Sequence, residues 1–412
     1  MPARARFCAL LFLLCLLPAA ALAQGKEKPK VRALTAFVRL DAAHYRDQVA
    51  DALVMLRRAK SDFERAGYEV QTIRISTQPF PEYLRGMSRE PARTFLLDYD
   101  QLAQKEGFDA DIGPAMLADA DDPQMADLLA EVLAQSKVLN ASLVVAGDDG
   151  IHWHAVRAAA RVMKYLEEHT PHGQGNFNFA ASAMVPSETP FYPASYHTGA
   201  GHSFAIGLQS ANVVAEAFST THDPEVAGKA LTKELGAHAQ AIEAVARRIA
   251  QETGWRYVGL DLSPAPLKDV SIGGAIENLT GAPFGSSGTM TAVSVITGVL
   301  HALPVQRAGY SGLMLPILED SVLAQRWSEG RLSLDSMLAY SAVCGTGLDT
   351  IPLPGAVSED QLARILGDMA ALAVKWHKPL SARLMPVPGG RPGDRTAFDD
   401  PFLTNATLHE LP

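Results

Sequence analysis

Cysteine is scarce in this 412-residue sequence. There are three, and two of them, Cys8 and Cys15, stand near the amino terminus. The third, Cys344, has no partner in the rest of the chain, which excludes a small fold held together by disulfides. A lone thiol is either a small buried side chain or one retained for its reactivity, and the sequence leaves both interpretations open.

Basic clusters and long hydrophobic runs are also missing. Lysine and arginine number 36 against 45 aspartates and glutamates, so the formal net charge is −9. We therefore expect no nucleic-acid partner and no binding to anionic membranes, because both are negatively charged. After the amino-terminal segment no apolar run is long enough to span a bilayer, so we expect no membrane association once that segment is removed.

What remains is an ordinary globular composition, with 48% hydrophobic and 20% charged residues. These values exclude disordered and collagen-like chains, and the length suits one large domain or two smaller ones. No internal stretch is rich enough in proline, glycine or serine to separate two domains. We therefore predict a single domain over residues 31–412.

The first 23 residues have the pattern of a secretory signal peptide. Two arginines open the segment, residues 7–17 are apolar, and Ala21-Leu22-Ala23 is a cleavage site of the A-x-A type. The alternative, a lipoprotein anchor at Cys15, is disfavoured because a large leucine precedes the cysteine. We predict cleavage after Ala23, a linker over residues 24–30, and a periplasmic or secreted protein.

Hydrophobic periodicity predicts strands that mostly alternate with helices. The predicted strands cover 31–40, 70–75, 108–117, 142–146, 176–185, 203–209, 255–262, 313–317, the apolar run after Asp349, and 380–387. The predicted helices cover about 45–65, 91–105, 125–139, 154–168, 223–253, 272–279, 290–300, 321–328, 334–342 and 359–376. Alternation of this kind favours a parallel sheet or a barrel with helices outside.

The segment from Ser341 to Gly355 combines the remaining thiol with a tight turn. Cys344 is followed by glycines at 345 and 347 and then by Asp349. A thiolate is a strong nucleophile where a neighbouring base or cation lowers its pKa, so Cys344 is a candidate nucleophile. The alternative is a small buried hydrophobic side chain.

Four carboxylates fall at the ends of predicted strands. Asp349, Asp261 and the pair Glu319-Asp320 are candidates for acid–base chemistry or for orienting a substrate. Each of them could equally cap the helix that follows.

Histidines offer few metal sites. His197 and His202 are five residues apart in a loop, and His152 and His154 flank a tryptophan, but neither pair has a third ligand at a recognisable spacing. We assign no metal ligands, although the sequence leaves open whether a metal binds, and keep His197 as a candidate catalytic residue.

Small residues before one predicted helix suggest an anion site. In Gly285-Ser286-Ser287-Gly288-Thr289, backbone N–H groups could approach an anionic group, although the Lys of a Walker A loop is absent and Thr289 could simply cap the helix. Ser263 and Arg383 are further candidates for ligand binding. Arg383 or Arg391 could clamp a carboxylate, and the alternative is that the stretch from 383 to 394 is a tight surface turn.

Five motifs in order along the chain resemble one family. They are Asp261-Leu262-Ser263-Pro264-Ala265-Pro266, the Gly285–Thr289 loop, Tyr310-Ser311-Gly312-Leu313 with Glu319-Asp320, Cys344-Gly345-Thr346-Gly347-Leu348-Asp349, and Pro386-Val387-Pro388-Gly389 through Gly393-Asp394. Together they are similar to the domain-of-unknown-function family 711, also called uncharacterised protein family 0210, over residue 31 to the end.

The resemblance implies a ten-stranded α/β barrel of the pyruvate formate-lyase-like fold, and it implies no activity. Glycyl radical enzymes of that fold class carry Arg-Val-x-Gly-Tyr near the carboxyl terminus. Here Arg307-Ala308-Gly309-Tyr310 is only a partial match and lies far from the end, so we expect no glycyl radical. Fold likeness alone does not fix function.

The sequence therefore predicts an exported enzyme for a small polar or anionic metabolite. Its site would combine the Cys344 thiol with carboxylates at a barrel end. The alternatives are a non-catalytic periplasmic binding protein that uses the same pocket and a scaffold or oligomerisation module. No cofactor is indicated, and the sequence leaves open whether the chain forms a homo-oligomer.

Overall fold

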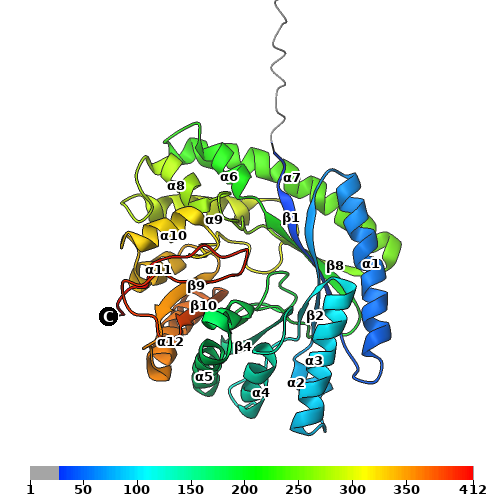
Figure 1. Cartoon of the computed structure of the whole chain (residues 1–412). Helices are drawn as coiled ribbons and strands as arrows, with labels where there is room; N and C mark the ends of the chain where they lie inside the picture. Colours follow the sequence, from blue (N-terminus) through cyan, green and yellow to red (C-terminus); the bar gives the residue numbers. More distant parts are fainter. Residues whose placement is uncertain (1–26, 412) are drawn as a thin grey trace, which may run out of the picture.

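The computed structural model describes residues 27–411 of the chain (Figure 1). The predicted signal peptide and the first residues of the predicted linker lie outside the described residues. None of the helices in the described part is both long and apolar enough to cross a membrane.

The described residues form one ten-stranded sheet. Its strands are β1 (Lys30–Val38), β2 (Val70–Thr77), β3 (Asp109–Asp111), β4 (Leu139–Gly147), β5 (Gly150–Ile151), β6 (Phe179–Ala183), β7 (Ser203–Gln209), β8 (Arg256–Asp261), β9 (Gly347–Pro354) and β10 (Leu380–Val387). The order across the sheet is β8-β7-β1-β2-β3-β4-β6-β10-β9, with β5 attached to β4. The predicted ten-stranded α/β class is confirmed.

The sheet is mixed rather than parallel throughout. Strands β1, β2, β3, β4 and β6 run in one direction. Strand β7 joins β1 antiparallel and β10 joins β6 antiparallel, and each has a further parallel neighbour, β8 and β9. Alternation of strands and helices predicts the parallel core, but it carries no information about these two reversals.

An irregular segment over residues 306–319, the closing segment, connects the two ends of the strand order. Leu260 in β8 donates its backbone N–H to the carbonyl of Gln306 at 2.8 Å. Further along, the carbonyl of Leu313 accepts from Gly345, just before β9, at 2.6 Å. Backbone hydrogen bonds therefore connect this irregular segment to both edges of the sheet, although β8 and β9 do not pair directly, and we call the strands together with this segment the strand ring.

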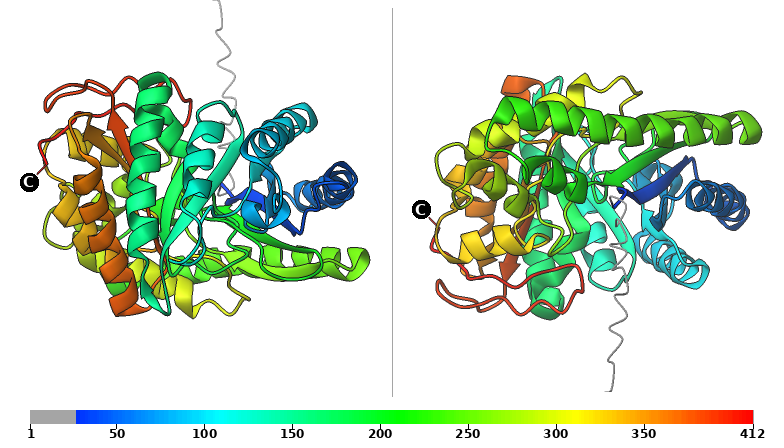
Figure 2. Two further views of the ribbon diagram at one scale, coloured as in Figure 1. Left: turned by 90° about the horizontal axis from the view of Figure 1, so that it is seen from below. Right: turned by 90° about the horizontal axis from the view of Figure 1, so that it is seen from above.

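Helices surround the strands on the outside (Figure 1). They are α1 (Tyr45–Arg65), α2 (Phe80–Tyr83), α3 (Arg89–Glu106), α4 (Gln124–Leu133), α5 (Trp153–His169), the 3-10 helix η1 (Pro171–Asn178), α6 (Ala211–Phe218), α7 (Pro224–Thr253), α8 (Ile272–Thr280), α9 (Thr289–Ala302), α10 (Ser321–Ser328), α11 (Leu334–Ser341) and α12 (Glu359–Trp376). The long helix α7 packs against α1, α6 and α9 along one side (Figure 2).

The helix faces follow the apolar spacing of the sequence. In α1 the apolar residues Val49, Leu53 and Leu56 recur at helical spacing and are buried on the side that packs against β1 and β2. The predicted strand 313–317 is wrong: its apolar residues are buried in the closing segment, because an apolar run signals burial but not a regular conformation. The eight-residue helix α6 (Ala211–Phe218) was not predicted.

Candidate functional site

A cavity of about 210 Å³ opens among charged side chains at one end of the strand ring. Its walls include Arg32 from β1, Arg74 from β2 and Arg383 from β10, and we call it the arginine cavity. Asp109 and Asn140 in its wall stand at the amino-terminal ends of β3 and β4. The cavity therefore lies at the amino ends of these parallel strands, opposite to the carboxyl ends where α/β sites usually form.

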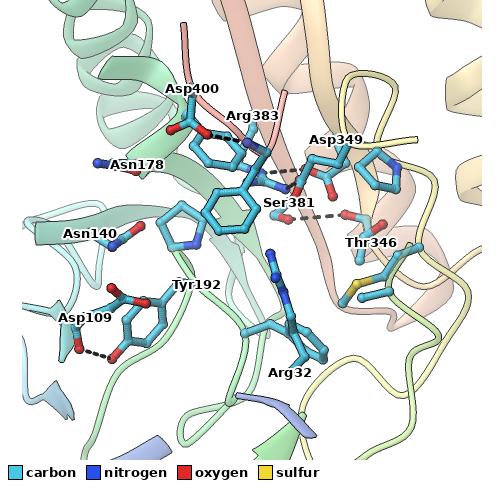
Figure 3. Close-up of a pocket in the computed structure, with 18 of the residues that line it drawn as sticks. Arg32, Asp109, Asn140, Asn178, Tyr192, Thr346, Asp349, Ser381, Arg383 and Asp400 are labelled. Carbon is cyan, nitrogen blue, oxygen red and sulfur yellow. Dashed lines mark hydrogen bonds and ion pairs between the residues drawn. The ribbon is translucent and has the colours of Figure 1, made fainter. Parts of the chain in front are cut away.

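An ion-pair network lies on one side of the cavity (Figure 3). Arg383 donates from Nε to Asp349 Oδ1 at 2.6 Å and from Nη2 to Glu319 Oε1. All three side chains are largely buried, with exposed fractions of 12%, 8% and 9% for Arg383, Asp349 and Glu319. One guanidinium thus joins a carboxylate of β9 to one of the closing segment.

Burial sets the charge states in this network. Desolvation raises the pKa of Glu319, and repulsion from Asp349 adds to the effect, while the positive charge of Arg383 opposes it. The two carboxylates raise the pKa of Arg383 against the opposing effect of burial. Arg383 therefore stays charged, and Glu319 is the carboxyl group in the network that takes up a proton more easily than an ordinary glutamate.

Arg32 stands in the same cavity without a carboxylate partner. It forms no ion pair with any described residue, and its one hydrogen bond runs from Nη1 to Gln71 Oε1 at 3.4 Å. Burial lowers its pKa, and the nearby charges of Arg74 and Arg383 lower it further. Figure 3 shows its guanidinium group directed into the middle of the cavity. A guanidinium has five N–H donors, so most of those of Arg32 are free for an anion.

Aromatic rings hold the three arginines in place. Each guanidinium lies over one ring, at about the distance of a cation–π contact. The pairs are Arg32 over Phe402 at 5.0 Å, Arg74 over Tyr192 at 4.7 Å, and Arg383 over Phe177 at 5.0 Å from the ring centroid. The rings fix the cations without neutralising them, which leaves their charge available in the cavity.

Other polar groups complete the wall. Asp109 lies 3.7 Å from Arg74 Nε, and Asp400 accepts a hydrogen bond from the backbone N–H of Phe402 at 2.8 Å. The hydroxyl of Thr346 is buried without a hydrogen-bond partner among the described residues. The cavity is thus suited to a small ligand that carries both negative charge and hydrogen-bonding groups.

Three of the residues predicted from sequence meet here: Glu319, Asp349 and Arg383. The predicted nucleophile does not join them. Cys344 has no exposed area, and it lies in the wall of a different hollow. The next residue, Gly345, packs directly on the backbone of Gly312, where a Cβ atom would not fit. A side chain with no exposed area cannot attack a substrate in this conformation, so the buried interpretation of Cys344 fits the structure.

Asp320 is occupied by the backbone of two helices. It caps α10 by accepting from Val322 and Leu323, and it also accepts from the backbone N–H groups of Ile272 and Gly273 at the start of α8 and from the hydroxyl of Ser271. These contacts give Asp320 a structural role, and we leave it out of the candidate site.

Asp261 and Ser263 hold the closing segment. Asp261 accepts from the backbone N–H groups of Tyr310 and Ser311 at 2.8 and 2.9 Å and from the Ser263 hydroxyl at 2.6 Å. A Cβ atom at Gly309, whose φ is +60°, would lie 2.1 Å from Asp261 Oδ2. Both predicted residues thus fasten backbone, away from the arginine cavity.

His197 and the glycine–serine loop also lie elsewhere. The buried His197 faces Glu188 through Nδ1 at 3.2 Å and the Gly201 carbonyl through Nε2 at 3.1 Å. Contacts with His197, Arg256 and Ser203 lower the pKa of Glu188 to about 2 against the effect of burial. The loop at Gly285–Thr289 leads into α9 and contributes no residue to the arginine cavity. Its backbone N–H groups therefore do not join Glu319 and Asp349 in one site.

Sequence reasoning missed Arg32 and Arg74. Each is a charged residue inside an otherwise apolar strand, as in Val-Arg-Ala-Leu and Ile-Arg-Ile. That interruption was a usable signal, because a buried arginine needs a partner or a ligand. Residues 27–411 contain no cluster of three or more His, Cys, Asp or Glu side chains placed to hold an ion.

A family model and the similar proteins found by sequence comparison indicate the same family. The family model described as "Uncharacterised ACR (DUF711)" matches residues 24–399. A UPF0210 protein of Pyrobaculum aerophilum is 34% identical over 349 residues, which cover 80% of this chain and 76% of that protein. The UPF0210 protein of Pyrobaculum arsenaticum is 32% identical with the same coverage, and that of Methanopyrus kandleri is 30% identical over 76% of this chain and 72% of its own length.

Proposed function

This chain belongs to the DUF711 family, and we propose that it is an enzyme acting on a small anionic metabolite bound in the arginine cavity. The observation that carries the proposal is Arg32, a partly buried guanidinium directed into the cavity without an ion-pair partner among the described residues. An unpaired cation held away from bulk water is costly unless a ligand neutralises it.

The geometry favours a carboxylate as the anionic group. Arg32 offers a planar pair of N–H donors, the arrangement that binds both oxygens of one carboxylate. Arg383 is already engaged by Asp349 and Glu319, and Arg74 has Asp109 nearby, so Arg32 is the anchor and Arg74 adds to the local positive potential. Asn140 and Thr346 can then bind the uncharged polar groups of the metabolite.

Within this proposal Glu319 is the group that transfers a proton. It lines the cavity, and burial raises its pKa, so it can hold a proton closer to neutral pH than an exposed glutamate can. Asp349 and Arg383 keep it oriented. The reaction class is therefore proton transfer to or from a carboxylate-bearing metabolite. Neither the binding of the metabolite by Arg32 nor the proton transfer by Glu319 requires Cys344.

A thermal-shift series with succinate and citrate tests the binding step. At about a hundredfold excess over Kd, a ligand that binds only the folded protein adds about 3 kcal/mol to the free energy of unfolding. We expect at least one of these anions to raise the melting temperature of the wild type and to have no such effect on Arg32→Gln. The matched control is Arg85→Gln, which removes an exposed arginine outside the cavity. If the anion raises the melting temperature of Arg32→Gln as much as that of the wild type, Arg32 is not the residue that anchors the anion.

Export is part of the proposal and rests on the first 23 residues alone. Their basic start, apolar run and Ala21-Leu22-Ala23 motif support passage through a secretory membrane and cleavage after Ala23. We expect the protein isolated from the periplasm or the medium to begin at Gln24, as read by mass spectrometry of the intact chain. A cytoplasmic protein that retains Arg4 and Arg6 would contradict it.

A further inference from the structure

Two neighbouring hollows open at the other end of the strand ring from the arginine cavity. Their volumes are about 440 and 530 Å³, and they share His301, Tyr310 and Pro379. Met184, just after the carboxyl end of β6, lies in one wall, and Pro379 directly precedes β10. Because β6 and β10 are antiparallel, both positions mark one end of the ring, whereas Asp109 and Asn140 in the wall of the arginine cavity mark the other.

The charged lining of these hollows is of one sign. His301 at the end of α9, Arg307 in the closing segment and Lys378 before β10 all contribute, and we call the two hollows together the basic groove. None of the described residues lining either hollow is an aspartate or a glutamate. A cationic groove of this kind is unexpected on a protein with a net charge of −9.

The two cations, Arg307 and Lys378, are close enough to His301 to disfavour its protonation. Burial lowers the pKa of His301, and the charges of Arg307 and Lys378 lower it further. Lys378 is itself partly buried, which lowers its pKa, and its Nζ donates to the Ser341 carbonyl at 3.0 Å. None of the three forms an ion pair with a residue between 27 and 411. An anion from solution would neutralise Arg307 and Lys378 and would remove the repulsion that disfavours protonation of His301.

An exposed aromatic side chain stands beside these charges. Trp376, the last residue of α12, is 60% exposed and lines the same hollow as His301 and Lys378. A single exposed aromatic ring is ordinary on a protein surface, and Trp153 is 50% exposed as well, so what distinguishes Trp376 is its place beside His301 and Lys378 in the same hollow. Its flat face offers a surface on which a planar ring can stack next to the bound charge.

We propose that the basic groove is a second binding site, separate from the arginine cavity, for a small organic phosphate with a planar ring. Two cations, a histidine and no acid suit a doubly charged group better than a single carboxylate, and a phosphate ester presents enough acceptor oxygens for all three side chains. The ring of the ligand lies against Trp376. The site does not depend on the function proposed for the arginine cavity, because the two share only Tyr310 among their lining residues.

Calorimetric titration with phenyl phosphate in a phosphate-free buffer tests the site. We expect binding to the wild type and an affinity about tenfold lower or worse in Arg307→Gln and in His301→Gln, because each variant loses a hydrogen bond to the phosphate and Arg307→Gln also loses a positive charge. Both residues are exposed, so the variants should fold. Arg248→Gln, which removes an exposed arginine of α7 outside the groove, should bind as the wild type does.

Two further comparisons separate the groove from its alternatives. Trp376→Ala should weaken phenyl phosphate but leave methyl phosphate unchanged, and Arg32→Gln should leave both unchanged. Equal losses in Arg307→Gln and Arg248→Gln would overturn the proposal by showing binding through net charge alone. Loss of phenyl phosphate binding in Arg32→Gln with full binding in Arg307→Gln would overturn it by assigning the phosphate to the arginine cavity.

Discussion

Replacing Arg383 with methionine is expected to lower the free energy of unfolding by about 3–5 kcal/mol at pH 8, the usual cost of removing one partner from a buried ion pair. The guanidinium binds Asp349 and Glu319 at once, and both carboxylates are more than nine-tenths buried. Without it two negative charges remain together in the cavity, and each has lost its strongest donor.

The loss should be smaller at pH 5. Once the cation is gone, protonation is the remaining way to relieve two buried negative charges, so the variant gains stability as the pH falls. Urea unfolding of wild type and Arg383→Met at both pH values measures the difference. Arg391→Met is the control, because Arg391 is exposed in a turn and such surface changes usually stay within about 0.5 kcal/mol. Equal losses at pH 5 and pH 8 would contradict the explanation by uncompensated charge.

The double variant Arg383→Met with Glu319→Gln refines the test. Glutamine cannot carry the second negative charge, so it should restore about 1–2 kcal/mol of the stability that Arg383→Met loses. The effects of substitutions on the free energy of unfolding are not additive when the residues share a network. Full additivity of the two losses would mean that Arg383 acts on Asp349 alone.

Replacing Asp261 with alanine is the other change with a large expected effect, a loss of about 3–5 kcal/mol in the free energy of unfolding. Its carboxylate accepts from Ser263, Tyr310 and Ser311 in a fully buried position, and each donor left without an acceptor costs about 1–3 kcal/mol. Because these bonds hold the closing segment to β8, backbone amide exchange should accelerate first in residues 308–312. Exchange that rises uniformly over the chain would contradict this local role.

The pH dependence of Asp261 has a definite sign. Burial raises its pKa from 3.8 to about 6, although the hydrogen bonds from Ser263 and the backbone oppose this. The folded chain then binds the proton more tightly than the unfolded chain, so the unfolding free energy falls as the pH rises from about 4 to 6, by about 3 kcal/mol. Asp261→Asn cannot titrate and should lack this decrease. Parallel stability profiles of wild type and Asp261→Asn over that range would disprove the raised pKa.

Much of the architecture follows from local sequence. Strands such as 203–209 and helices such as 321–328 and 359–376 match their predicted bounds, because apolar periodicity and capping residues determine them locally. The antiparallel joints at β7 and β10 could not be predicted, since strand order depends on packing between elements far apart in the chain.

The candidate site was predictable only in part. Glu319 and Asp349 were identified as carboxylates at predicted strand ends and Arg383 as a candidate clamp for a carboxylate, yet their meeting depends on the pairing of β9 with β10. Asp320 satisfied the same pattern and proved to cap a helix, an alternative that the sequence had left open. Cys344 shows most plainly what the sequence could not predict. A glycine-rich turn does not reveal whether its cysteine side chain faces solvent or the core, and the thiol is in fact fully buried.

A crystal structure of the protein with citrate would test the central claim most directly. If Arg32 anchors an anionic metabolite, a carboxylate of citrate should lie about 2.7–2.9 Å from its guanidinium nitrogens, and Arg32→Gln crystals grown in the same way should lack it. Citrate bound elsewhere while the arginine cavity stays free of it would contradict the assignment of this cavity as the metabolite site.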